Sequence, residues 1–124
     1  MSIQRDFIGF SGEFRAPGQA VIEPGRFAEA LQLQIQELAR LAGVHRATVS
    51  DAPANTRLQN YMREALQVLS AAYELTEDRE RALYWFRNAP IREFDHRTAE
   101  QLVAEHKTKA VLNYLASIGS GSTG

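Results

Sequence analysis

The sequence predicts an all-α protein, and two observations carry this prediction. After residue 24, apolar residues recur at intervals of three and four over most of the chain, which is the spacing of an amphipathic helix. The breaks between these segments hold proline, glycine or capping residues, which are typical of helix boundaries. We expect an extended arm at 1–24, a helix-turn-helix-like region at 25–54 packed on a small helical domain at 55–119, and a flexible tail at 120–124.

Composition bounds the class of protein. The chain has 124 residues, enough for one domain or two small helical subdomains that share a core. A net charge of −1 gives no overall positive field, so any nucleic-acid contact must come from a small local patch. Cysteine is absent, which excludes disulfides and thiolate metal sites. With no signal-peptide pattern and no apolar run of about 18 residues, we expect a soluble cytoplasmic protein with no membrane contact.

The first 24 residues differ from the rest. Residues 7–14 alternate bulky apolar side chains with small or polar ones, and Gly9, Gly12 and Pro17 interrupt any helix. We expect an extended arm or a short hairpin. Two interpretations stay open: a strap that covers the core of its own chain, or a contact with another chain through strand addition.

Residues 35–52 have the residue order of a helix-turn-helix. Counted from residue 35, alanine stands fifth, glycine ninth, and apolar residues fourth, tenth and fifteenth. Ala39 must be small because the second helix crosses close to it, and Gly43 supplies a turn conformation that a side chain opposes. Leu38, Val44 and Val49 would form the wedge that fixes the angle between the helices.

The second helix of this corner carries the candidate DNA contacts. A helix placed in the major groove would present residues from its first turns to the bases, with an arginine suited to guanine or phosphate. The candidate DNA-binding residues are His45, Arg46, Thr48 and Ser50. Against this, Asp51 would repel the phosphate backbone, and Pro53 ends the helix early. A DNA-binding corner and a purely structural corner both remain open.

Four later helices follow from capping patterns and apolar spacing. Thr56 and Thr76 are expected to cap the long central helix and the helix that carries Trp85, the only tryptophan. Thr98 and Gln101 form a capping-box pattern ahead of a helix at 99–105, and a last helix is expected at about 107–118. We expect Trp85 to be a buried anchor of the C-terminal half.

This C-terminal order resembles the toxin-binding domain of Xre/MbcA/ParS-type antitoxins. In that domain a helix end with leucine, an aromatic residue and Asn-Pro precedes an Arg-Thr or Arg-Pro helix and a final apolar helix. The matching positions are Ala82, Leu83, Trp85, Asn88, Pro90, Arg97, Ala99, Leu102, Val103, Val111, Leu115, Ile118 and Gly119. The resemblance covers about residues 26–119.

The chain departs from the family pattern at three places. Asn88 and Pro90 are separated by an alanine where the family usually has them adjacent. Asp95 and His96 stand where the family often has a glycine before the Arg-Thr pair. Asp51 and the alanine after it replace a frequent Arg-Trp, which weakens the case for sequence-specific DNA binding.

The resemblance implies the antitoxin of a type II toxin–antitoxin pair. It implies a cognate toxin of the RES or ADP-ribosyltransferase kind, which attacks with or consumes NAD, and neutralisation by steric occlusion. Homodimers and toxin–antitoxin hetero-oligomers are implied, with operator DNA as a further partner if the corner binds it. The alternative is a stand-alone helix-turn-helix transcriptional regulator with a helical dimerisation domain. A weaker third interpretation is an adaptor with no DNA role.

The last helix and tail are where we expect the toxin to bind. Lysine and asparagine side chains there can donate to the sites of the ligand's phosphates, and the helix has more apolar positions than one buried stripe needs. The thin tail can enter a cleft that excludes a helix. The predicted toxin-binding residues are Lys107, Lys109, Val111, Leu112, Asn113, Leu115, Ile118, Gly119 and Ser120.

The residues needed for catalysis do not assemble in the sequence. No two of His45, His96 and His106 have the three- or four-residue spacing that places two ligands on one helix face. A glycine loop for phosphate followed by lysine is also missing. We therefore expect no enzyme activity, no metal and no cofactor.

Overall fold

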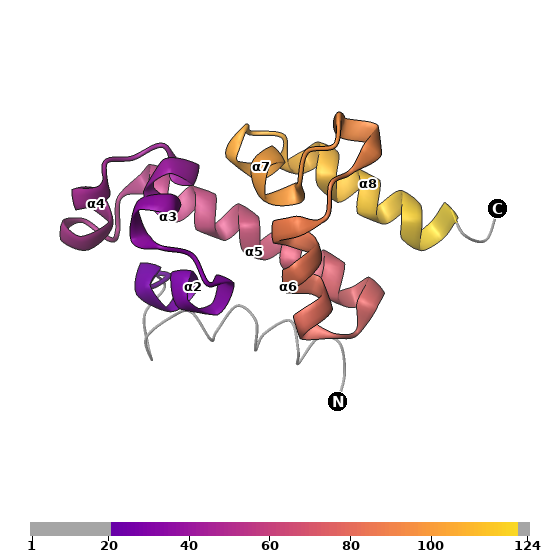
Figure 1. The fold of residues 1–124 in the computed structure, drawn as a ribbon, viewed down its shortest axis with the longest axis horizontal. Helices are drawn as coiled ribbons and strands as arrows, with labels where there is room; N and C mark the ends of the chain where they lie inside the picture. The colour runs from indigo at the N-terminus through magenta and orange to yellow at the C-terminus, as the bar shows by residue number, and fades with distance from the viewer. Residues whose placement is uncertain (1–20, 122–124) are drawn as a thin grey trace. The chain divides into compact units, whose positions relative to one another are not determined.

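A computed structural model describes residues 21–121, so most of the predicted arm lies outside the described residues. In this part the structure is all-α, as the sequence predicted, with no β-strand and with an isolated bridge between Ile91 and Arg97 (Figure 1). The elements are α2 (Pro24–Leu31), α3 (Ile35–Ala42), α4 (Arg46–Asp51), α5 (Thr56–Thr76), α6 (Arg79–Asn88), the 3-10 helix η1 (Arg92–Phe94), α7 (Ala99–Ala104) and α8 (Thr108–Gly121).

Packing divides the chain into two compact units. Unit 1 is Met1–Leu66 and unit 2 is Gln67–Gly124, so the boundary between them falls inside α5. Helix α5 therefore supplies residues to both units. No helix within residues 21–121 is long and apolar enough to cross a membrane.

Unit 1 is built around α3, which packs against α2 and α4. Pro24 occupies the first turn of α2, where its missing N–H costs nothing, and Phe27 and Leu31 are buried one turn apart. Helix α3 ends at Gly43, whose φ of 73° lies in the left-handed region that favours glycine. This glycine turns the chain into α4.

The start of α5 differs from the prediction, which was a capping-box pattern formed by Thr56 and Gln59. Asn55, not Thr56, caps the helix, because its Oδ1 accepts a hydrogen bond from the Leu58 amide at 3.0 Å. Gln59 faces inward and is buried. Its Nε2 donates to the carbonyl oxygens of Ile22 and Pro53, both at 2.8 Å, and its Oε1 accepts from the Ile22 amide at 3.0 Å. Gln59 thus satisfies buried backbone groups instead of closing a capping box.

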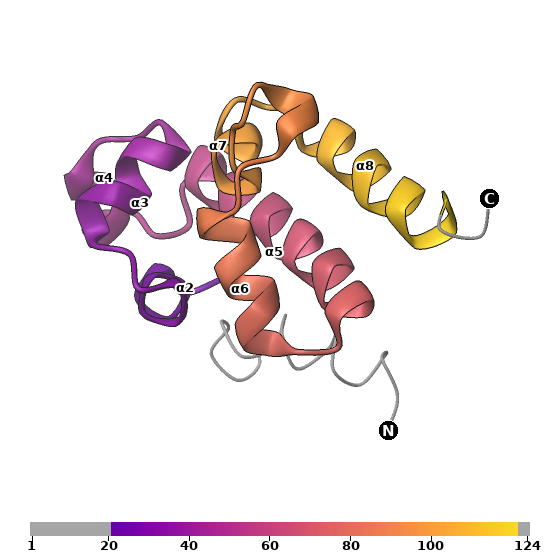
Figure 2. The same ribbon diagram turned by 45° about the vertical axis from the view of Figure 1, so that its right-hand side comes forward.

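Unit 2 contains the end of α5 and all later helices. The chain turns after α5 and α6 runs back, as both views show (Figures 1 and 2). Asp78 caps α6 by accepting from the Arg81 amide at 3.1 Å. The predicted cap, Thr76, is instead the last residue of α5, and its hydroxyl accepts from the Asp78 amide at 3.2 Å. Thr76 and Asp78 can both act as caps, and Asp78 caps α6 because it lies directly before the helix.

Helix α7 packs against both α6 and α8. The capping box predicted for α7 is confirmed, with Thr98 Oγ1 accepting from the Gln101 amide and the Gln101 side chain accepting from the Thr98 amide. Between α6 and α7, Arg87 Nε lies 3.0 Å from Glu100 Oε2, and the Glu100 side chain is almost fully buried. This ion pair joins the two helices in a largely water-excluded place.

Helix α8 is longer than predicted and reaches Gly121, so the chain is still helical beyond position 118. Gly119 does not end the helix. A Cβ at this glycine would lie 3.2 Å from Leu75 Cδ2, which is closer than side chains normally pack. Gly119 therefore lets α8 lie against the end of α5.

Candidate partner-binding surfaces

The α3–α4 corner has the features that the spacing predicted. Leu38 and Val49 are buried, and Val44 is half-buried between them in sequence. The Arg57 guanidinium donates from Nη1 to the Gly43 carbonyl at 3.1 Å, which ties the start of α5 to the turn. The corner is thus held by apolar packing and by a hydrogen bond to its turn.

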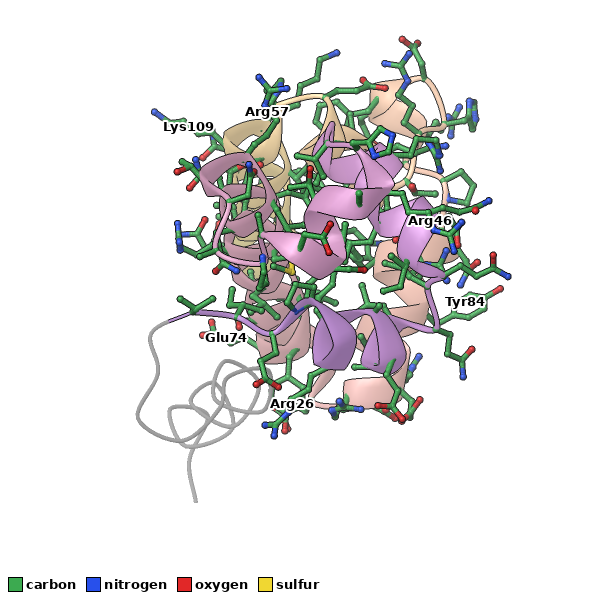
Figure 3. All side chains as sticks on the ribbon, turned by 90° about the vertical axis from the view of Figure 1, so that its left-hand side faces the viewer. Arg26, Arg46, Arg57, Glu74, Tyr84 and Lys109 are labelled. Atoms are coloured by element: carbon green, nitrogen blue, oxygen red, sulfur yellow. The ribbon has the colours of Figure 1, made fainter. Side chains whose placement is uncertain are left out.

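The four predicted DNA-binding residues lie in or just before α4. Arg46 and Ser50 are exposed, Thr48 is half-buried, and Figure 3 shows the Arg46 side chain directed into solvent. His45 is exposed but already serves as the N-cap of α4, with Nδ1 accepting from the Ala47 amide at 3.1 Å. Helix α4 has 6 residues and ends at exposed Asp51, so its recognition surface is short.

The nine predicted toxin-binding residues fall into three groups. Val111 and Leu115 are buried in the core and do not reach the surface. Leu112 is half-buried. The exposed members are Lys107, Lys109, Asn113, Ile118, Gly119 and Ser120.

Lys107, just before α8, and Lys109, within it, differ in their surroundings. Lys107 Nζ lies 3.9 Å from Glu105 Oε1, which also accepts a 2.7 Å hydrogen bond from Arg97. Lys109 projects into solvent (Figure 3) and makes no ion pair with the residues that the structure describes. Asn113 is exposed one turn further along α8. Lys109 and Asn113 therefore form a polar exposed strip.

The prediction that Trp85 is the buried anchor of unit 2 is wrong. The inward residues of α6 are Ala82, Leu83 and Phe86, and Phe86 has no exposed surface. Trp85 is only half-buried. Three neighbouring aromatic residues on one helix point in different directions, and the tertiary packing selected the third as the core residue.

An open pocket of about 580 Å³ lies on the outside of α6 and the joint before it. Half-buried Trp85 lines it together with Tyr84, which is 67% exposed and projects outward in Figure 3. The lining residues are Thr76, Asp78, Glu80, Arg81, Tyr84, Trp85 and Ala89. The sequence signal for this surface was an aromatic residue outside the apolar stripe of its helix.

A second apolar surface lies where α5 meets α8. Leu75 is 41% exposed and approaches Gly119, while Ile118 on the same helix is 44% exposed. Leu75 was not among the predicted binding residues. Within residues 21–121, the three exposed large hydrophobic side chains are Leu75, Tyr84 and Ile118, and all three belong to unit 2.

Among residues 21–121, no three or more His, Asp or Glu side chains gather in a way that could hold a metal ion. His96 and His106 are exposed joint residues with φ values of 64° and 65°. Tyr114 of α8 packs edge-on against Phe94, with ring centroids 5.9 Å apart. Burial, and secondarily the carboxylate of Glu93, raise the pKa of the Tyr114 phenol. This tyrosine therefore stays neutral at physiological pH and acts as a packing residue.

These surfaces define an all-helical protein with a helix-turn-helix corner in one unit and exposed apolar side chains in the other. Residues 71–121 match the family model described as the antitoxin Xre/MbcA/ParS C-terminal toxin-binding domain. The match confirms the resemblance over residues 71–121, and it suggests an antitoxin that binds a cognate toxin through this stretch. Comparisons with curated proteins and with solved structures gave no match.

Proposed function

We propose that this protein is the antitoxin of a type II toxin–antitoxin pair and sterically inhibits a toxin that consumes NAD, of the RES or ADP-ribosyltransferase kind. The observation that carries the proposal is the family match over residues 71–121. The same stretch holds the exposed large hydrophobic side chains of the described chain. Apolar surface of this kind commonly marks a protein contact. In this proposal the antitoxin and its toxin both act in the cytoplasm, where NAD is available.

Helix α8 is the element best suited to close an NAD cleft. Lys109 and Asn113 lie four residues apart, and both are exposed, so they share one face. Their donors can occupy the places of the dinucleotide phosphates, for which a lysine is a point-charge ligand. Ile118 lies further along α8 and offers an apolar contact beyond this strip. Together they give α8 a polar strip followed by an apolar end.

The test is growth on co-expression with the protein encoded by the adjacent gene, together with a pull-down. Deleting residues 107–124 would remove buried Val111 and Leu115, so its failure would not separate folding from binding. The informative variant is Lys109→Glu/Asn113→Asp, which replaces the positive charge of the exposed strip with two negative charges. We expect it to weaken protection by at least about tenfold in toxin dose, the scale of a binding hot spot.

A matched control is Arg63→Glu, which reverses an exposed charge on α5 in unit 1. We expect it to leave protection unchanged. A second variant ends the chain at Ile118, after the last buried residue of α8, and should fold but protect less. If both α8 variants bind the toxin and protect fully, the neutralising surface does not lie on this helix.

DNA binding is the second function that an observation favours. The α3–α4 corner, with Gly43 at φ 73°, is the arrangement of a helix-turn-helix. In an antitoxin dimer or toxin–antitoxin assembly it would give autorepression at an operator. The alternative is a stand-alone transcriptional regulator whose helical second unit only dimerises. The antitoxin is supported over the regulator if an adjacent gene encodes an NAD-handling toxin and co-expression of this chain restores growth.

A further inference from the structure

The pocket on α6 is separate from the α8 surface considered above. We propose that this Tyr84–Trp85 pocket is a second contact site for the toxin and receives an apolar side chain from it. The inference rests on the proposed function, because its occupant is the toxin. It adds a docking site on a different helix and names the chemistry that fills it.

The pocket has the residue types of a binding hot spot. Tyr84 is 67% exposed, and it lines the pocket together with half-buried Trp85. Tryptophan, tyrosine and arginine are the side chains that contribute most to protein–protein binding. Arg81, the third such residue, lines the same pocket and makes no ion pair within residues 21–121. Its guanidinium can bind a carbonyl or carboxylate at the edge of an inserted side chain.

The acidic residues of the pocket do not define it as a cation site. Asp78 Oδ1 is already engaged with the Arg81 amide at the start of α6. Glu80 lies 3.8 Å from Arg79 and is almost fully exposed. The charges in and around the pocket are mixed in sign, so the aromatic rings are its dominant surface. An apolar side chain is therefore the group that gains most by entering.

Hydrogen bonds hold the backbone that carries the pocket residues. Thr76 hydrogen-bonds the Asp78 backbone at the joint, and Asn88 Nδ2 donates to the Tyr84 carbonyl at 3.2 Å. Fully buried Phe86 anchors α6 immediately beside the two aromatic residues. A backbone that is already held in place loses less conformational freedom on binding, so less of the contact energy is spent on ordering it.

The position of the pocket in the chain identifies the toxin as the occupant. All its lining residues fall within 71–121, the range that matches the toxin-binding domain. The described part of unit 1 has no exposed large hydrophobic side chain, so this kind of surface is confined to the matched region. A contact between copies of this chain is the competing occupant.

The sole tryptophan makes the pocket directly observable. With 5-fluorotryptophan in this chain only, Trp85 gives the single ¹⁹F resonance of the sample. The probe is the unlabelled protein encoded by the adjacent gene. We expect the resonance to shift when the complex forms. We also expect Tyr84→Ala to weaken the complex at least about tenfold, as truncation of a hot-spot aromatic does.

Two controls separate contact from folding. Tyr84→Phe keeps the ring and should bind nearly as the parent does, and Gln67→Ala changes an exposed residue of α5 in the same unit and should have no effect. Because Tyr84 is mostly exposed, its truncation should leave the thermal melt unchanged.

Each contrary outcome overturns a different statement. An unshifted resonance in a saturated complex, with Tyr84→Ala binding like the parent, removes the pocket from the interface while the proposed function stands. A resonance that shifts with the concentration of this chain alone assigns the pocket to a second copy. If the parent chain forms no complex and gives no protection, the proposed function is wrong. The toxin is then also wrong as the occupant of the pocket.

Discussion

Several residues in the joints of unit 2 have backbone conformations that usually belong to glycine. Asp95 and His96 have φ values of 57° and 64°, and Glu77 and His106 have 54° and 65°. For residues other than glycine the left-handed conformation costs roughly 1–2 kcal/mol each. Positions 95 and 96, ahead of Arg97, are therefore places where a glycine would remove backbone strain.

His96→Gly should therefore stabilise the protein. The imidazole is exposed and His96 contributes only its backbone, whose amide donates to the Ile91 carbonyl at 2.9 Å. Relief of strain, less the entropy that glycine adds to the unfolded chain, should give about 0.5–1 kcal/mol. Thermal denaturation followed by circular dichroism measures it. Arg92→Gly, at an exposed residue without positive φ, is the control and should destabilise. A lower melting temperature for His96→Gly would contradict this account of the joint.

Phe86 should matter more to stability than Trp85. Phe86 is fully buried, so truncation to alanine should cost roughly 3–5 kcal/mol, a large part of the stability of a small domain. Trp85→Ala removes a half-buried ring and should cost clearly less. Urea denaturation of the two variants, followed by circular dichroism, makes the comparison. Equal losses would mean that the indole is a core group after all.

At the scale of elements, the sequence predicts best where local chemistry decides. The spacing around Ala39 and Gly43 predicted the corner, and Thr98 with Gln101 predicted the cap of α7, because both depend on residues a few positions apart. Where neighbours compete, the outcome is tertiary. Asn55 displaced Thr56 as the cap of α5 once Gln59 was drawn into the core.

The binding surfaces were predicted less completely than the helices. Apolar spacing placed Val111 and Ile118 on the same last helix, but it could not tell that the first is buried and the second exposed. Leu75 and Tyr84 are surface residues because no neighbouring helix in the described part of the chain covers them. Exposure depends on which faces other elements cover, and that information is not local in the sequence.

The charged side chains at the two ends of α4 determine the affinity for DNA that we expect. Arg46 is exposed at the start of this helix and Asp51 is exposed at its end. Arg46→Ala should lower affinity for operator DNA, because it removes a phosphate or guanine contact, whereas Asp51→Arg should raise it by replacing a repulsive charge. Electrophoretic mobility shifts with DNA from upstream of the gene, at a fixed salt concentration, measure both. Equal and weak binding by parent and variants would show that the corner is structural only.

At the scale of the whole molecule, the two units carry different kinds of surface. Unit 1 contains the corner and presents charged and polar side chains from α4, while unit 2 presents Leu75, Tyr84 and Ile118. One continuous helix, α5, contributes to both units. We expect the second unit to hold the toxin and the first to serve regulation, in homodimers and larger assemblies with the toxin.

If this chain blocks an NAD-consuming toxin, it does so by covering the NAD cleft of that toxin. The most direct test is NAD turnover by the purified protein from the adjacent gene, measured as this chain is added. We expect turnover to be lost near equimolar antitoxin, and we expect higher NAD concentrations to raise the amount of antitoxin required. The Lys109→Glu/Asn113→Asp variant should inhibit less. Unchanged NAD turnover in a fully formed complex would contradict the claim.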